Sequence, residues 1–98
     1  CRCFLVLITS SLFEQTMFYI YILHSQLNNK YYIGSTQNTE ERLIRHNSGR
    51  SKATKTGIPW IIVYTETFST RSEALKREYQ IKSWKSRVMI EKLIDKHK

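Results

Sequence analysis

The sequence predicts an α/β domain of the α+β type: a small three-stranded antiparallel sheet flanked by helices, in the order β-β-α-β-α-α. Two aromatic and β-branched runs joined by a polar turn occupy residues 18–36, and a third such run occupies residues 59–68. Capping residues followed by helical patterns come between and after these runs. With 98 residues, the chain has room for one domain with a modest core.

The first two runs, residues 18–23 and 30–36, are predicted to pair as a hairpin across the turn 25–29. Asn residues in this turn suit a tight connection. Tyrosines are unusually frequent here, at Tyr19, Tyr21, Tyr31 and Tyr32. Because each buried phenol needs a hydrogen-bond partner, four hydroxyls indicate a polar surface as well as a core.

A helix is predicted over Thr39–Asn47. Residues 37–39 offer capping side chains, and the glutamates at 40–41 favour the positive end of the helix dipole. Leu43 and Ile44 are expected to supply its apolar contact.

Arg42 and His46 are four residues apart on this helix, so they project from one face. Judged alone, Arg42 is a surface charge paired with Glu41 or Asn38. His46, judged alone, is a capping or solvated residue near a helix end.

Residues 48–57 are predicted to form a flexible, basic loop without apolar anchors. Its cations, Arg50, Lys52 and Lys55, lie among small hydroxyl residues that suit contact with DNA phosphates. The alternative is a mobile connection.

The strand predicted over residues 59–68 is apolar on both pleat faces from Trp60 to Val63. A strand of this kind is typically sandwiched between layers. Trp60, Ile62 and Val63 are therefore expected in the core.

A second helix is predicted from the cap Thr70 to about Ser83, with Glu73 completing a capping box. Helical projection places Glu78 inside the apolar arc formed by Leu75, Ile81 and Trp84. An inward carboxylate must be paired or bound to a metal. From this helix alone, a metal and a salt bridge to Arg42 or Arg71 are equally well supported.

A terminal helix is predicted over residues 86–97. Its expected core side chains are Val88, Met89, Leu93 and Ile94, and His97 is a tail residue. Lys82, Lys85 and Arg87 crowd the turn before it, which makes that turn a second candidate for contact with a nucleic-acid backbone.

The formal net charge is +8, and it is concentrated after Gly49, where twelve Lys and Arg face five acids. A phosphate-facing surface and a solvated exterior both explain this excess. Nucleic acid is favoured over a membrane, because no basic amphipathic helix with a broad apolar face is evident. Cys1 and Cys3 form neither a disulfide framework nor a zinc pattern, which favours a reducing, cytoplasmic setting.

Residues 1–16 contain an apolar run far shorter than the about 20 residues that cross a bilayer. Met17 is the expected start of the domain, which then covers 17–98. Residues 1–16 are expected to be an upstream extension, or alternatively a leader.

Tyr19-Ile20-Tyr21 followed by Tyr32-Ile33-Gly34 resembles the GIY-YIG nuclease motif, with Tyr19 at the position of the motif's first Gly. The similarity covers residues 17–87. The resemblance is strengthened by the downstream residues 42–47 and by Glu78. The chain is most similar to small single-domain bacterial members, and it is also similar to the N-terminal nuclease domain of the bacterial excinuclease.

The resemblance implies specific roles. Arg42 contacts the scissile phosphate, and His46 assists water activation or orients a tyrosine. Tyr21 accepts a proton from the attacking water while Tyr32 positions it, with His46 as the alternative base. Glu78 binds one Mg²⁺ or Mn²⁺ ion.

The function expected from this resemblance is Mg²⁺-dependent endonucleolytic hydrolysis of duplex or branched DNA, in repair or recombination, with targeting by a partner protein left open. The alternative is a catalytically weak nucleic-acid-binding module on the same scaffold. Many members place an Asn where this chain has Ser83, Lys85 and Ser86, and this departure favours the alternative.

Overall fold

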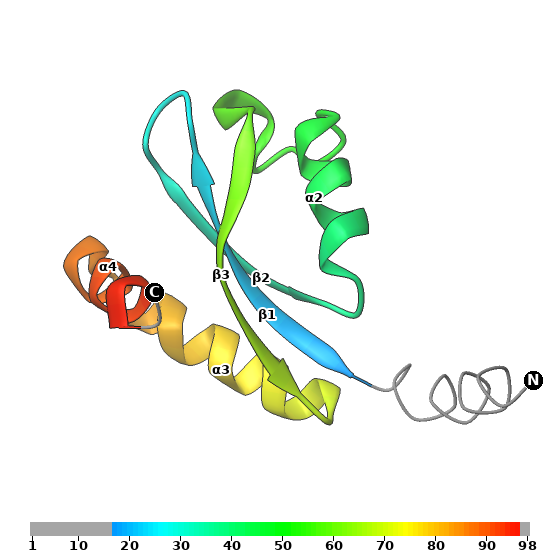
Figure 1. Cartoon of the computed structure of the whole chain (residues 1–98), viewed down its shortest axis with the longest axis vertical. Coiled ribbons are helices and arrows are strands. Elements are labelled where there is room, and N and C mark those ends of the chain that lie inside the picture. The colour runs from blue at the N-terminus through cyan, green and yellow to red at the C-terminus, as the bar shows by residue number, and fades with distance from the viewer. Residues whose placement is uncertain (1–16, 97–98) are drawn as a thin grey trace, which may run out of the picture.

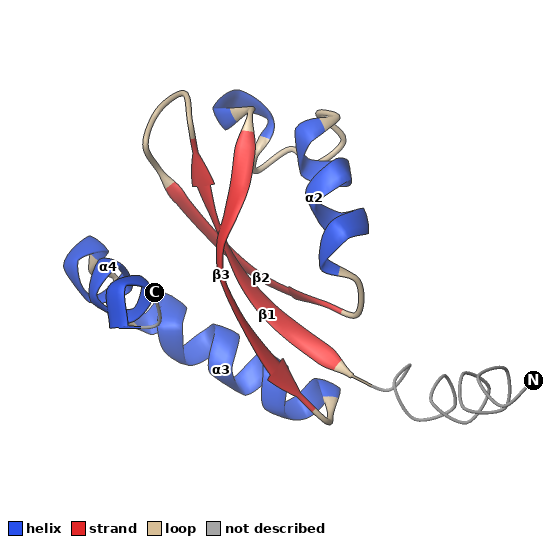
Figure 2. Cartoon of the chain, in the orientation of Figure 1, coloured by secondary structure: helices blue, strands red, loops and turns tan. Residues whose placement is uncertain are grey.

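The computed structural model describes residues 17–96 of the chain. The expected extension 1–16 and the tail residue His97 lie outside the described residues. In this described part of the chain, three strands and three α-helices follow one another in the predicted order (Figure 2). They are β1 Phe18–Ser25, β2 Tyr31–Thr36, α2 Thr39–Asn47, β3 Trp60–Phe68, α3 Arg71–Ser83 and α4 Arg87–Lys96, with a 3₁₀ turn, η1 Lys55–Gly57, before β3.

The sheet is antiparallel with the strand order β2-β1-β3, so β1 is the central strand. Helix α2 covers one face, and α3 and α4 cover the other (Figure 1). Residues 20–23 of β1 are all buried because both faces of this strand are covered. Ile20 and Ile22 face α3 and α4, whereas Tyr21 and Leu23 face the side of α2. The predicted fold class is confirmed.

The hairpin turn is held by the buried hydroxyl of Ser25. Its Oγ accepts hydrogen bonds from the backbone N–H groups of Leu27 and Asn28 and donates one to the carbonyl of Gly57. Asn29 adopts a φ of 63°, a left-handed conformation that Asn tolerates better than most residues. Local chemistry therefore sets the register that pairs Tyr21 with Gly34.

The predicted helix caps are confirmed. The Asn38 side chain accepts a hydrogen bond from the N–H of Glu41, and Thr70 Oγ1 accepts one from the N–H of Glu73. Each cap satisfies a backbone donor that a helix start leaves without an intrahelical partner.

The prediction that Trp60, Ile62 and Val63 are core residues is confirmed for Trp60 and only in part for Ile62 and Val63, which pack against the two core clusters from their edges. Both side chains are half-buried, and the side chain of Ile61 is exposed. The physical reason is that β3 is an edge strand, and a register shift opposite Ile22 and Leu23 interrupts its pairing with β1. The strand sandwiched between layers is β1.

Four predicted apolar contacts are wrong: the side chains of Ile44, Leu75, Val88 and Met89 are exposed. In α4 the buried positions are Ile90 and Ile94, with Leu93 packed beside them. The rotation of a short helix about its axis is set by packing against the sheet, and a mixed apolar pattern leaves that rotation ambiguous.

The basic loop is anchored, contrary to the prediction. Thr54 is fully buried, and its carbonyl accepts a 2.7 Å hydrogen bond from Trp60 Nε1. Gly57 lies against the same indole, because a Cβ at this position would be 2.4 Å from Trp60 Cζ2. The loop is therefore fastened to the beginning of β3 by two contacts with Trp60.

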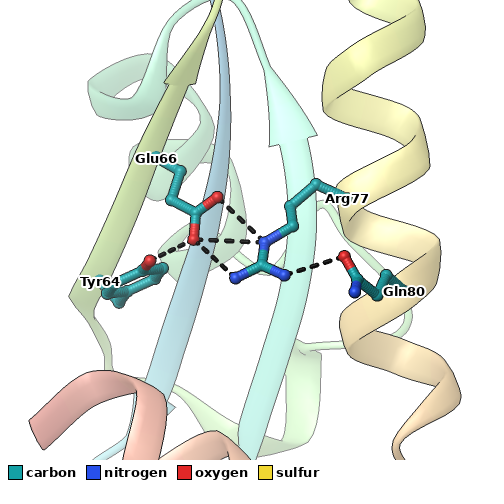
Figure 3. Close-up of polar contacts among 4 residues, drawn as sticks. All are labelled: Tyr64, Glu66, Arg77 and Gln80. Carbon is teal, nitrogen blue, oxygen red and sulfur yellow. Dashed lines mark hydrogen bonds and ion pairs between the residues drawn. The ribbon is translucent and has the colours of Figure 1, made fainter. Parts of the chain in front are cut away.

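Helix α3 is fixed to β3 by a half-buried polar network (Figure 3). The Arg77 guanidinium donates to the Glu66 carboxylate, with a 3.0 Å ion pair, and also to the side-chain oxygen of Gln80. Tyr64 donates its hydroxyl proton to the same carboxylate. Because Arg77 precedes Glu78, this network also holds the backbone that carries Glu78.

None of the helices within residues 17–96 has both the length and the apolar character to span a membrane.

Candidate active site

A tyrosine and a histidine from different elements meet on the α2 side of the sheet. Tyr21 Oη, on β1, lies 3.0 Å from His46 Nε2, on α2, and both residues are buried. The Tyr32 ring lies 5.0 Å from the His46 ring and 6.5 Å from the Tyr21 ring, between centroids. Three of the predicted site residues therefore form one cluster.

The second ring nitrogen of His46 fixes its orientation. Nδ1 lies 2.7 Å from the Thr54 hydroxyl, which lies 3.5 Å from the carbonyl of Ser51. If Thr54 donates its proton to that carbonyl, its oxygen accepts the Nδ1–H of neutral His46. Nε2 then carries the lone pair that accepts the Tyr21 proton. Sequence reasoning missed Thr54, and only its place in a hydroxyl-rich loop near Trp60 could have drawn attention to it.

The protonation states agree with this tautomer. Burial first, and then the positive charges of Arg42 and Arg45, lower the pKa of His46 from its ordinary value, which keeps the ring neutral at pH 7. Burial first, and then the charges of Tyr32 and Glu78, raise the pKa of Tyr21 to about 12 against the opposing effect of Arg42. At neutral pH a protonated phenol therefore faces a neutral imidazole acceptor.

Arg42 lies in the same cluster with an unsatisfied donor. Its Nε is buried and has no hydrogen-bond partner among the described residues. Among residues 17–96, the Arg42 side chain makes no ion pair with Glu41 and no hydrogen bond to Asn38, as its interpretation as a surface charge required. It acts instead on the Tyr21 phenol, whose pKa it lowers. A pocket of about 210 Å³ opens beside it, lined by Tyr32, Arg42, Arg45, His46 and Ser51. Two guanidinium groups make this pocket suitable for an anion such as a phosphate.

Glu78 lies on α3, which covers the other face of the sheet from α2. Its side chain is 17% exposed and pairs with Lys82 at 2.6 Å, not with Arg42 or Arg71 as the salt-bridge alternative expected. No hydrogen bond joins Glu78 to Tyr21 or Arg42 in the described chain, yet its charge contributes to the raised pKa of Tyr21. The carboxylate is thus within electrostatic reach of the cluster without touching it.

The side chains near Glu78 supply only part of the ligand set that a divalent cation requires. No group of three or more His, Cys, Asp or Glu side chains suited to a metal occurs in residues 17–96. One carboxylate together with water and substrate oxygens is nevertheless a usual ligand set for Mg²⁺. The half-buried Glu78 fits that set once Lys82 has moved away from it.

The predicted DNA-binding cations fall into two groups and one outlier. Arg50, Lys52 and Lys55 are exposed on the loop whose Ser51 borders the phosphate-sized pocket. Lys82 and Lys85 share a hollow at the end of α3. Arg87 instead lies over the Tyr31 ring, donates to the carbonyl of Asn29 and pairs with Glu91. The structure therefore does not place Arg87 with the other cations.

Comparison with known proteins gives concordant matches. The family model described as "GIY-YIG catalytic domain" matches residues 17–93. A UPF0213 protein of Staphylococcus haemolyticus is 46% identical over 67 residues, which cover 67% of this chain and 80% of that protein. A UPF0213 protein of Halobacterium salinarum is 36% identical over 67 residues, covering 67% of this chain and 86% of the relative. The solution NMR structure of a UPF0213 protein from Bacillus halodurans matches with a TM-score of 0.55 and 32% identity, covering 83% of this chain and 85% of the other.

Proposed function

The chain belongs to the GIY-YIG family, and from that premise we propose that it is a Mg²⁺- or Mn²⁺-dependent endonuclease acting on DNA in repair or recombination. The observation that carries this proposal is the 3.0 Å contact between Tyr21 Oη and His46 Nε2 beside an Arg42 guanidinium with an unsatisfied donor. A proton acceptor and a phosphate-binding cation in one pocket are what phosphodiester hydrolysis requires. We assign the domain to residues 17–98, in a cytoplasmic setting.

Tyr21 and His46 act as one base. The attacking water gives a proton to Tyr21 Oη as the phenolic proton passes to His46 Nε2, so no free phenolate forms. A tyrosine with a pKa of about 12 is protonated at pH 7, so it accepts the proton of water only as it passes its own proton to the neutral histidine. The water oxygen bonds to phosphorus, the bond from phosphorus to the 3′ oxygen breaks, and solvent protonates the departing oxygen.

Arg42 stabilises the charge that develops on a nonbridging phosphate oxygen. Tyr32 packs against His46 and borders the same pocket, so it positions the water and the ring. Glu78 would hold the divalent cation, whose bound form supplies Lewis-acid stabilisation of the phosphate and the 3′ oxygen. Arg50, Lys52, Lys55, Lys82 and Lys85 would contact the DNA backbone without reading its sequence.

The test is nicking of supercoiled plasmid with Mg²⁺. Glu78→Ala should abolish nicking while leaving the fold and the DNA affinity intact, and Glu40→Ala, which removes an exposed carboxylate from α2, should nick normally. Arg42→Ala should lower turnover more than affinity. Unchanged cleavage by Glu78→Ala would remove the metal assignment, and a defect in affinity alone would make Arg42 an anchor.

The second candidate is a nucleic-acid-binding module with little turnover. The observation that favours it is the 2.6 Å pair between Glu78 and Lys82, which occupies the proposed cation ligand. This candidate predicts salt-dependent DNA binding without cleavage. Incubation of the wild-type chain with plasmid, branched DNA and Mg²⁺ separates the two.

A further inference from the structure

An exposed aromatic side chain stands next to the proposed cation ligand. Tyr79 follows Glu78 on α3 and is 77% exposed, the most exposed of the large hydrophobic side chains in residues 17–96. It borders a hollow of about 520 Å³ together with Lys82, Ser83 and Lys85. We call this set the Tyr79 corner. Its volume lies within the about 300–1,000 Å³ typical of pockets for small organic groups.

The backbone at this corner is unusual at Lys85. Its φ of 48° places it in the left-handed region, and its N–H bonds to the carbonyl of Lys82. Lys85 thus occupies the position just after the helix cap Trp84, where Gly is the usual residue because it has no Cβ. A lysine held in this conformation costs stability, and such positions concentrate where a side chain serves a function.

The surrounding charge favours a polyanion. Lys76 and Lys82 lie three residues before and after Tyr79 and are exposed on the same side of α3. Glu78, the acid that precedes Tyr79 in α3, lies outside the corner and is paired with Lys82. Lys85 therefore borders the same hollow as the Tyr79 ring, and no acid is among the residues that line it.

We propose that the Tyr79 corner binds one unpaired nucleotide of the DNA substrate, with its base stacked on Tyr79 and its phosphate held by Lys85. This inference rests on the proposed function only in taking DNA as the ligand. An exposed ring surrounded by lysines is the arrangement by which proteins hold single strands, since every base offers a flat face and every nucleotide a charge.

The corner implies a preference for DNA with an open end, fork or gap. Inside a duplex both faces of each base are covered by neighbouring pairs, so Tyr79 can stack only on a base that has left the helix. The substrate class is therefore DNA in which paired and unpaired segments meet.

The test is fluorescence anisotropy with the full chain in EDTA, so that binding is measured without cleavage. The probes are a labelled blunt duplex, a fork with the same duplex and two unpaired arms, and a single strand. Tyr79→Ala should weaken binding to the fork and the single strand about tenfold and leave the blunt duplex unaffected. Tyr79→Phe should bind like the wild type, because the stacking face is kept.

Leu75→Ala is the matched control, an exposed apolar side chain one turn earlier on α3. It should leave all three affinities unchanged. Lys85→Gly should raise the melting temperature, weaken binding to every probe and reduce the salt slope by about 1. The proposal is overturned if Tyr79→Ala weakens binding to the fork and to the duplex equally, or if it weakens binding to none of the probes.

The binding and cleavage assays distinguish failure of the Tyr79 corner from failure of the nuclease assignment. If Tyr79→Ala selectively loses fork binding while the wild type never cleaves DNA, the corner is established and the nuclease assignment falls. If the wild type cleaves and Tyr79→Ala binds every probe normally, the nuclease stands and the corner does not.

Discussion

The Tyr21 phenol lies directly across Gly34. A Cβ built at Gly34 would be 2.5 Å from Tyr21 Oη and 2.8 Å from its Cζ, distances that ordinary contacts never reach. The two residues are partners in the β1–β2 register. The absence of a side chain at Gly34 is therefore what lets the phenol reach His46 on α2.

Gly34→Ala should displace the Tyr21 ring, because the added methyl group cannot coexist with it. We expect a loss of about 1–3 kcal/mol in the free energy of unfolding, typical of overpacking, together with loss of nicking. Urea unfolding and the plasmid assay measure the two effects.

A double-mutant cycle identifies the cause. If the phenol is the obstacle, Gly34→Ala should cost much less in a Tyr21→Ala background, because the space is then free. An equal cost in both backgrounds would place the strain in the β2 backbone instead.

Thr54 is the residue that sets the His46 tautomer, so its hydroxyl should matter for rate and not for DNA affinity. Thr54→Val keeps the shape of the side chain but removes the acceptor 2.7 Å from Nδ1. We expect kcat to fall about 10- to 100-fold, as for other partners that orient a histidine, with KM unchanged. Thr54→Ser should restore most of the rate, and equal rates for Val and Ser would end this assignment.

Local signals make much of the fold predictable. The hairpin, the Asn38 and Thr70 caps and the strand after Pro59 depend on neighbouring residues, and the structure places them as expected. The pairing of Tyr21 with His46 is predictable only through the family resemblance, because a spacing of 25 residues carries no local signal.

Features that depend on tertiary packing are not predictable in this way. The sequence does not reveal that β3 is an edge strand, since its apolar run is typical of a central strand. Nor does it reveal the burial of Thr54, which depends on Trp60 folding back over the loop. The Lys82 partner of Glu78 lies at the favourable i,i+4 spacing, so this pair could have been found.

The pH dependence should follow His46, which accepts a proton only when neutral. Its pKa is lowered from 6.5 by burial and by the charges of Arg42 and Arg45, so kcat/KM should decline only below pH 6.5. Arg45→Gln removes one of these charges and should move the inflection upward, whereas Arg50→Gln should not. An inflection above 6.5 in the wild type would contradict this assignment.

The same shift has a consequence for stability. A histidine whose pKa is lower in the folded state binds fewer protons there than when unfolded, so stability rises with pH through this window. The contribution of His46 to the free energy of unfolding is complete above pH 6.5 and is lost as the pH falls toward the folded-state pKa. His46→Gln should flatten this part of the curve of unfolding free energy against pH.

Lys82 competes with any cation for Glu78, because its ammonium lies 2.6 Å from the carboxylate. Lys82→Ala should therefore tighten divalent cation binding by about two- to fivefold, the range expected for a partly exposed ion pair of this spacing. Titration with Mn²⁺ followed by electron paramagnetic resonance measures this affinity without any turnover. Lys82→Arg keeps the charge and should show no gain, and Lys76→Ala controls for the loss of a lysine from the same helix. Glu78→Gln should abolish the binding, and a Lys82→Ala variant that binds Mn²⁺ no better than the wild type would mean that the cation is held elsewhere.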